Sequence, residues 1–304
     1  MMKRIAITGS NGFIGRKLVE KFLSNGHFVY GLDISDQHPI SHVNFKYIKS
    51  NLIDFGSELV ENLDIVFHLA WAGVSPEQRN DFDIQLNNLV FSKNVIDFAL
   101  SKNVKKLVFL GSAMEYSDCA SFISKETLPS PVNLYSSIKA SSRLIFSQLC
   151  DEKGIEFVYI VISSIYSEDR KDNNVVFYTI DSLLKNERPK LTTLEQRWNF
   201  IHISDVIEAL FLVGTNYDKK RSFYTLGGLE NLLLRQYIEL IRDLINPELP
   251  LGIGEIPSSK TRHQNVLISN QDLFEDYGYI PRTKFEDGIK IVIERVRMSN
   301  NGKI

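Results

Sequence analysis

Tyr135 and Lys139 are four residues apart, a spacing that places both side chains on one face of a helix. A phenol has an ordinary pKa of about 10 and is a poor base at neutral pH, but a neighbouring ammonium stabilises the phenolate and lowers that pKa. The pair is therefore suited to exchanging a proton with a substrate oxygen. Tyr135 is the only one of the twelve tyrosines with a lysine four residues later, although the spacing alone is equally explained by an exposed helix pair.

Ser112 adds a hydroxyl to this pair, because it ends the apolar run KKLVFLGS. A hydroxyl there would hydrogen-bond the reacting oxygen while Tyr135 handles the proton. A serine at a strand end also commonly caps the next turn, and that interpretation stays open. The position of Tyr135 favours chemistry, because it opens the helix that follows the Ser112 strand in a chain that also carries a dinucleotide-like turn.

That turn is the stretch ITGSNGFIG, in which Gly9, Gly12 and Gly15 separate an apolar strand from an amphipathic helix. Glycines let the backbone approach a ligand, and a helix N-terminus offers N–H groups and partial positive charge to a phosphate. FVYGLD then predicts a second strand that ends in Asp33, where an acid binds the adenosine ribose hydroxyls. The ordered set favours a bound dinucleotide over a glycine-rich turn without a ligand. An acid repels a 2′-phosphate, so NAD is favoured and NADP is the alternative.

The composition excludes several classes of function. Lysine plus arginine number 35 against 37 acidic residues among 304, a net charge of −2, so nucleic acid is not an expected partner. Cys119 and Cys150 form no CxxC motif and have no histidine cluster, which indicates neither a disulfide framework nor a metal site. No stretch reaches the roughly 18 apolar residues of a membrane span, and no signal-like segment precedes the first strand. We expect a cytoplasmic protein that does not bind membranes.

Short apolar strands alternate with helices through the first half of the chain. FVYGLD is followed by NFKYI, LDIVFHLA, KKLVFLGS and IEFVYIVIS, with long helices expected at 83–102 and 135–153. Strands buried on both faces are typical of parallel sheets. The pattern therefore predicts an α/β fold with a Rossmann-type doubly wound sheet.

The alternation ends after about Ser163. A polar loop at 167–174 is followed by helices expected at about 175–186, 205–214, 233–245 and 284–298. We predict a dinucleotide-binding domain over 1–165 plus about 198–226. A smaller mixed α/β substrate-binding domain would occupy 166–197 and 227–304, over the carboxyl ends of the strands.

Several of these motifs together resemble the extended short-chain dehydrogenase/reductases, and within them the nucleotide-sugar epimerase/dehydratase/reductase branch. They are TGSNGFIG, HLA at 68–70, Asn88, Ser112 and YSSIK at 135–139. RWNFIHISDV resembles the R-x-F-x-x-V-x-D segment of that branch, so the likeness runs from about residue 3 to at least 214. The resemblance implies NAD or NADP as cofactor, a nucleotide-diphosphate sugar as substrate, and a homodimer formed through the two long helices.

The resemblance also implies roles for individual residues. Hydride would pass between C4 of the nicotinamide and a sugar carbon, with Tyr135 exchanging the proton, Lys139 holding the nicotinamide ribose and Ser112 orienting the sugar oxygen. The expected cofactor contacts, besides Tyr135 and Lys139, are Gly9, Asn11, Gly12, Phe13, Ile14, Gly15, Asp33, Asn51, Leu52, Leu69, Ala70, Trp71, Asn88, Gly111 and Ile162. The expected substrate contacts are Trp71, Gln85, Ser112, Ala113, Met114, Ser163, Ser164, Arg197 and Asp205.

The residues after Ser112 bear on which reaction is catalysed. Sugar 4,6-dehydratases of this branch usually carry a Thr/Ser-Asp-Glu run, whereas here Ala113-Met114-Glu115 follows, so a dehydratase is the last choice. HLAWAG, the run from Gln85 to Asn88 and GSAMEY look like reductases acting on nucleotide-linked 4-keto-6-deoxyhexoses, and we favour that reaction. A 4-epimerase, and a dinucleotide-binding regulator without chemistry, are the alternatives; the presence of both tyrosine and lysine argues against the regulator.

Overall fold

The computed structural model describes residues 2–55, 62–116, 121–169, 174–216, 221–257, 265–300 and 302. Cys119 and residues 170–173 of the expected polar loop lie outside the described residues.

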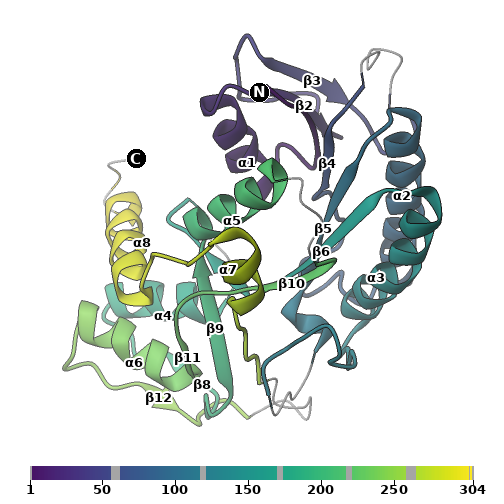
Figure 1. Cartoon of the computed structure of the whole chain (residues 1–304). Coiled ribbons are helices and arrows are strands. Elements are labelled where there is room, and N and C mark those ends of the chain that lie inside the picture. The colour runs from purple at the N-terminus through teal and green to yellow at the C-terminus, as the bar shows by residue number, and fades with distance from the viewer. Residues whose placement is uncertain are drawn as a thin grey trace.

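A seven-stranded sheet forms the centre of the molecule (Figure 1), with the strand order β10-β6-β5-β4-β1-β2-β3. Its strands are β1 (Arg4–Thr8), β2 (Phe28–Asp33), β3 (Phe45–Lys49), β4 (Ile65–His68), β5 (Lys106–Ser112), β6 (Glu156–Ile162) and β10 (Phe223–Leu226). Every neighbouring pair is parallel. The order reverses between β1 and β4, the switch point at which ligands bind in open α/β sheets. The predicted Rossmann-type sheet is thus confirmed.

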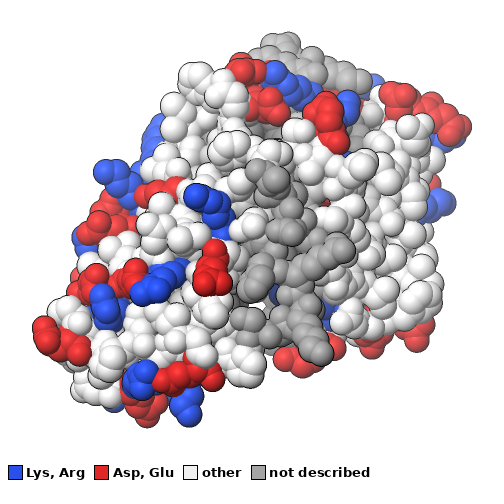
Figure 2. Space-filling view, turned by 90° about the horizontal axis from the view of Figure 1, so that it is seen from below, with Lys and Arg blue, Asp and Glu red and all other residues white. Residues whose placement is uncertain are grey.

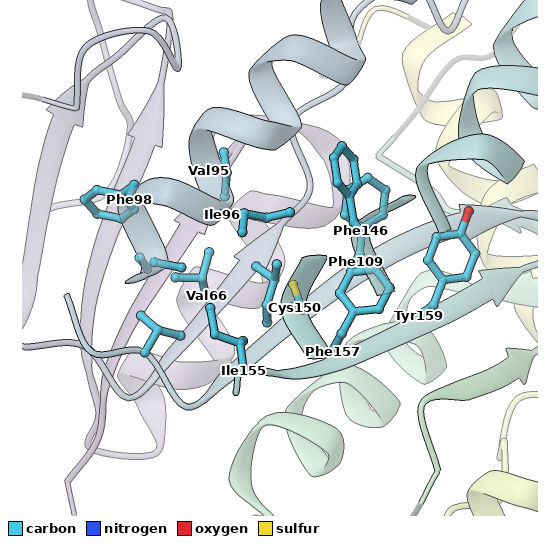
Figure 3. Close-up of a cluster of buried hydrophobic side chains, with 14 of the residues drawn as sticks. Val66, Val95, Ile96, Phe98, Phe109, Phe146, Cys150, Ile155, Phe157 and Tyr159 are labelled. Carbon is cyan, nitrogen blue, oxygen red and sulfur yellow. The ribbon is translucent and has the colours of Figure 1, made fainter. Parts of the chain in front are cut away.

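Helices cover both faces of this sheet. On one face lie α2 (Phe82–Ser101) and α3 (Leu134–Lys153), and on the other α1 (Phe13–Ser24), α5 (Ile203–Thr215) and α7 (Gln271–Tyr277). Figure 3 shows part of the first interface, where Val66, Phe109 and Phe157 of the strands face α2 and α3. The strands are apolar on both sides because both sides are covered.

The second half of the chain builds a separate apolar cluster around two small sheets. The sheets contain β7 (Ser164–Tyr166), β9 (Arg197–His202) and β11 (Asn231–Leu233), and β8 (Lys190–Leu191) with β12 (Gly252–Ile253). The helices are α4 (Val175–Leu184), α6 (Leu234–Ile245) and α8 (Phe285–Asn300). They lie together at the lower left of Figure 1, away from α2 and α3.

Two strands of the segment predicted to rejoin the dinucleotide-binding domain divide between the sheets. β10 extends the seven-stranded sheet beside β6, whereas β9 pairs with β7 and β11 in the smaller sheet. The predicted helices all form, with ends that differ from the expected ones by a few residues. The domain boundaries themselves stay a prediction.

Surface charge follows the near-neutral composition. On the face in Figure 2, Lys and Arg side chains lie among Asp and Glu. Over the described part of the chain, no helix has the length and apolar character needed to cross a bilayer.

Candidate active site

The glycine turn after β1 is packed so tightly that its glycines cannot be replaced without movement. Gly9 has a φ of +69°, a left-handed conformation that favours glycine. A Cβ on Gly9 would lie 2.8 Å from the backbone nitrogen of Ala70, and a Cβ on Gly15 would lie 2.0 Å from the carbonyl oxygen of Gly9. The turn therefore brings the start of α1 against the ends of β1 and β4, at the switch point of the sheet.

This turn fits the diphosphate of a dinucleotide. The N-cap of α1 is Gly12, which has no side chain to accept hydrogen bonds from the first N–H groups of the helix. Its N–H instead bonds the Gly9 carbonyl at 3.0 Å. The helix begins without a side-chain cap and with the positive end of its dipole, which is the local chemistry that binds phosphate. Phe13 and Ile14 are half-buried in the first turn.

Asp33 ends β2 beside the same turn. Its Oδ2 accepts a hydrogen bond of 3.0 Å from the N–H of Asn11, and its Oδ1 accepts one from Ser35 at 3.2 Å. A carboxylate has about four lone-pair positions, so acceptor capacity is left for ribose hydroxyls. Asn51 instead uses its Oδ1 for the N–H groups of Ile53 and Asp54, and Leu52 is buried with a φ of +62°.

Thr8 and His68 hold the loop after β4 against the glycine turn. Thr8 Oγ1 accepts from the N–H groups of Leu69 and Ala70, both at 3.2 Å, and lies 2.8 Å from His68 Nδ1. His68 Nε2 lies 2.9 Å from Ser92 Oγ on α2. Burial, with a nearby ammonium, lowers the pKa of His68 to about 3, so the imidazole is neutral and structural.

Ser112, Tyr135 and Lys139 converge at the carboxyl edge of the sheet. A side-chain hydrogen bond joins Ser112 to Tyr135. The buried Lys139 Nζ donates to the Leu110 carbonyl at 2.8 Å. Helix α3 begins just before Tyr135 because Asn133 is its N-cap. The Asn133 side chain accepts a hydrogen bond of 2.9 Å from the N–H of Ser136. The three residues that the sequence singled out thus lie at one site.

The expected electrostatics of the tyrosine are wrong for this arrangement. Burial raises the pKa of the Tyr135 phenol above its usual value, although the Ser112 hydrogen bond lowers it. The Lys139 ammonium is directed to the Leu110 carbonyl and to Trp71, whose ring centroid is 3.7 Å from Nζ. The i, i+4 spacing fixed the shared helix face but could not reveal where the ammonium points.

Residues of the loop after β4 are held by side chains of α2. Trp71 Nε1 donates to Gln85 Oε1 at 3.2 Å, and Gln85 Nε2 donates to the Gly73 carbonyl at 2.8 Å. Asn88 clamps Ala72 through bonds of 2.8 and 3.0 Å to its N–H and carbonyl. Gln85, expected to contact substrate, is buried and shapes this loop instead. Trp71, by contrast, is half-buried with its ring beside Tyr135 and Lys139.

Four expected substrate residues come from the second half of the chain. Ser163 follows β6, and its buried Oγ has no hydrogen-bond partner among the described residues. Ser164 Oγ accepts from Trp198 Nε1 at 2.9 Å. Arg197 is exposed at the start of β9, with one guanidinium N–H on the Asn231 carbonyl at 3.3 Å.

Asp205 binds backbone groups of a distant segment. Its two carboxylate oxygens accept from the N–H groups of Arg282 and Thr283 at 2.9 and 3.0 Å, and it is buried. It ties the first turn of α5 to the segment before α8. The N-cap of α5 is His202, whose ring accepts a hydrogen bond from the N–H of Ser204. The motif alone could not separate these roles, because the partners of Asp205 are some 77 residues away in the chain.

Glu115 is a further buried group, which at the level of the sequence bears only on the comparison of residues 113–115 with the Asp-Glu run of dehydratases. It ends a 3-10 turn, η1 (Ala113–Glu115), and forms a capping box with Ser112. The Ser-x-x-Glu pattern at 112–115 is the sequence signal that predicts such a box. In this turn Ala113 is buried and Met114 half-buried. Among the described residues no cluster of histidine, cysteine and acidic side chains is arranged to hold a metal ion.

Comparison with known proteins agrees with this geometry. The sequence model described as the NAD dependent epimerase/dehydratase family matches residues 5–227. The chain belongs to this family. It is therefore an NAD-dependent enzyme of the short-chain dehydrogenase/reductase type, in a family of nucleotide-sugar epimerases, dehydratases and reductases.

Individual members of the NAD-dependent epimerase/dehydratase family are distant relatives. The dTDP-4-dehydro-6-deoxyglucose reductase of Escherichia coli is 22% identical over 316 residues, covering 96% of this chain and 97% of the relative. The CDP-abequose synthase of Yersinia pseudotuberculosis is 25% identical over 287 residues, covering 90% and 97%. The UDP-N-acetylglucosamine 4-epimerase of Methanobrevibacter ruminantium M1, solved with UDP-N-acetylmuramic acid, has the same fold, with a TM-score of 0.85 over 98% of this chain and 99% of that one at 20% identity.

Proposed function

We propose that this enzyme reduces the 4-keto group of a nucleotide-linked 4-keto-6-deoxyhexose. The observation that carries the proposal is the meeting of Ser112, Tyr135 and Lys139 at the switch-point edge, beside a turn that fits the diphosphate of NAD. The names of the Escherichia coli reductase and the Yersinia synthase support the substrate class.

In the proposed reaction the protein positions the sugar and supplies one proton. NAD, bound in its reduced form, would supply the hydride for the sugar carbon. Ser112 Oγ would hydrogen-bond the carbonyl oxygen, and the Tyr135 hydroxyl would donate the proton that converts it to an alcohol. Burial raises the pKa of Tyr135, so the phenol carries that proton at neutral pH, as a reductase needs. Acid catalysis by a positioned group of this kind contributes about 10²–10⁴-fold to the rate.

Lys139, whose Nζ lies against the face of the Trp71 ring, would hold the nicotinamide ribose. Its Nζ is held by the Leu110 carbonyl and the indole face, and an ammonium has three donors, so it can bind ribose hydroxyls in addition. Trp71 would form one wall for nicotinamide and sugar, and Ser163, with its unpartnered Oγ, would contribute a donor from the next strand end. Arg197 would bind the diphosphate of the sugar nucleotide.

Glu115 argues against the dehydratase reaction. It is fully buried and its Oε1 is bonded to the protein, so it is not available to a sugar above Ser112. The burial of Glu115 and the absence of an aspartate directly after Ser112 both argue against a 4,6-dehydratase.

A substrate panel tests the proposal. NADH oxidation is followed with nucleotide-linked 4-keto-6-deoxyhexoses, while UDP-glucose and UDP-galactose are assayed for interconversion without net NADH consumption. A reductase consumes one NADH for each sugar reduced, and Tyr135→Phe abolishes that turnover while keeping NADH binding. Tyr178→Phe, on α4 and away from the site, is the matched control and keeps full activity. Interconversion without NADH consumption would identify an epimerase instead, and NADH binding without turnover of any sugar would identify a regulator.

A further inference from the structure

Glu115 is a buried carboxylate that the proposed proton transfer does not use. Its side chain has 0% relative exposure and lies directly beneath Ser112. Burying an ionisable group costs free energy unless hydrogen bonds or opposite charges compensate. The surroundings of Glu115 supply hydrogen bonds to Oε1, whereas its buried Oε2 has no hydrogen-bond partner among the described residues.

One oxygen of this carboxylate joins three elements of the site. Oε1 accepts a hydrogen bond from the N–H of Ser112 at 2.6 Å and another from the Tyr159 hydroxyl at 2.8 Å. The same hydroxyl lies 3.0 Å from the backbone carbonyl of Lys139. Glu115 thus connects the end of β5 to β6, and through Tyr159 to the turn of α3 that carries Lys139.

Packing around this network leaves little freedom. A Cβ on Gly111 would lie 2.8 Å from Glu115 Oε1 and 2.3 Å from the Tyr159 ring. The Tyr159 ring stacks on Phe109 with centroids 5.7 Å apart, and Figure 3 shows its hydroxyl at the margin of the apolar cluster, pointing away from Phe157. The hydroxyl is therefore aimed at Glu115 by the core beneath it.

The charges in this region balance around Lys139. Burial lowers the pKa of Lys139, and the charge of Glu115 raises it. Burial raises the pKa of Glu115 to about 7, although the hydrogen bonds from Ser112 and Tyr159, and then the charges of Lys139 and Arg143, oppose that rise. The other titratable groups facing this pair are Tyr135 on α3, His68 on β4, Tyr159 on β6 and Tyr116 after η1.

We propose that Glu115 is a positioning residue of this active site, whose carboxylate holds Ser112 and the Lys139 turn of α3 in register and, when ionised, supplies a counter-charge to Lys139. The catalytic consequence rests on the proposed function, but the effect on Lys139 does not. Glu115 acts through Ser112 and Lys139 and touches neither substrate nor cofactor.

The test separates charge from hydrogen bonding. In Glu115→Gln the side chain keeps an oxygen for Ser112 and Tyr159 but loses its charge. The pKa of Lys139 is measured by NMR with lysine labelled at the ε carbon, its signal being the one missing in Lys139→Met. We expect that pKa to fall by roughly one unit or more, the usual effect of removing a nearby opposite charge. Glu152→Gln, an exposed acid on the same helix α3, leaves the Lys139 signal and the activity unchanged.

Activity gives the second readout. Glu115 raises the pKa of both Lys139 and Tyr135, so its neutralisation lowers both. Since reduction needs a charged Lys139 and a protonated Tyr135, the alkaline limb of the kcat profile moves to lower pH in Glu115→Gln. We expect kcat at neutral pH to fall about 10- to 100-fold, as misplacement of catalytic groups does, with the NADH dissociation constant changed much less.

A second variant keeps the proposal testable if Glu115→Gln fails to fold. Tyr159→Phe removes one hydroxyl from the network, keeps the stacked ring, and is expected to lower both kcat and the Lys139 pKa. An unchanged Lys139 pKa in whichever of the two variants folds overturns the proposal, whatever happens to the melting temperature. If no sugar is turned over but the Lys139 pKa falls, the proposed reaction is refuted and the role of Glu115 stands.

Discussion

Replacing Gly15 by alanine is the sharpest test of the dinucleotide turn. The new Cβ would lie 2.0 Å from the Gly9 carbonyl oxygen and 3.0 Å from the Cα of Ser10. To reach even 3.0 Å from that oxygen, the start of α1 and the turn must separate by about 1 Å. Both neighbours are backbone, so no side-chain rotation can relieve the contact. The movement also stretches the 3.0 Å hydrogen bond from Gly12 to Gly9.

The magnitude follows from these contacts. Overpacking of a tight site costs about 1–3 kcal/mol, so we expect the melting temperature to fall by several degrees. A separation of about 1 Å carries the first N–H groups of α1 away from the phosphate, and each hydrogen bond to a charged group contributes about 1.5–3 kcal/mol. Loss of one such bond weakens NADH binding roughly 10- to 100-fold. Fluorescence titration with NADH and thermal unfolding measure the two effects separately.

A second glycine provides the control. Gly26 has a φ of +77°, with no atom within 4 Å of a Cβ built on it. Gly26→Ala introduces left-handed strain of about 1–2 kcal/mol, a stability cost similar to that of Gly15→Ala, and leaves the turn intact. We expect it to lower the melting temperature and to keep the wild-type affinity for NADH. Equal affinities for Gly15→Ala and the wild type would refute the assignment of the turn to the diphosphate.

Three further predictions concern other parts of the molecule. Because burial holds the pKa of His68 near 3 in the folded state, the contribution of His68 to the free energy of unfolding is constant above the unfolded pKa of about 6.5 and falls by about 1.4 kcal/mol per pH unit between that pKa and about 3; urea unfolding at several pH values should show a slope that is smaller by this amount in His68→Gln. Trp71 and Trp198 are the two tryptophans, and Trp71 lies in the site, so Trp198→Phe should keep the tryptophan fluorescence change on NADH binding and Trp71→Phe should lose it; the opposite pattern would exclude Trp71 from the cofactor site. Phe82 and Val90 are 62% and 51% exposed on α2, so we predict a homodimer through this apolar face, which light scattering should show as a wild-type dimer that Val90→Asp converts to a monomer.

Local patterns predicted most of the fold. The period of apolar residues and the glycine punctuation placed the six strands predicted in the first half, and the long helices, within a few residues of their observed ends. This succeeds because strands buried on both faces are apolar throughout, and helices that cover a sheet carry one apolar stripe. The division of β9 and β10 between two sheets was beyond these patterns, since both are short apolar strands and their partners lie elsewhere in the chain.

The candidate site likewise contains features that follow from local sequence and features that depend on contacts between distant segments. The glycine turn and the spacing of Tyr135 and Lys139 are local features, and the sequence could therefore propose them for the cofactor and the proton transfer. Gln85 and Asp205 each bind backbone groups that only folding brings near, so the sequence could not reveal these contacts. The Ser-x-x-Glu pattern at 112–115 is visible in the sequence, but the proposed role of Glu115 depends on its burial and on a hydrogen bond from Tyr159, 44 residues later.

By itself, the sequence determined the parallel sheet, the glycine turn after its first strand and the shared helix face of Tyr135 and Lys139, because those depend on residue type and on spacing within one strand or helix. Tertiary structure alone decided the direction of the Lys139 ammonium, the rise in the pKa of the Tyr135 phenol and the joining of Glu115 to Ser112 and Tyr159. The reason is physical: these properties depend on burial and on hydrogen bonds between distant segments, and neither exists until the strands are assembled side by side.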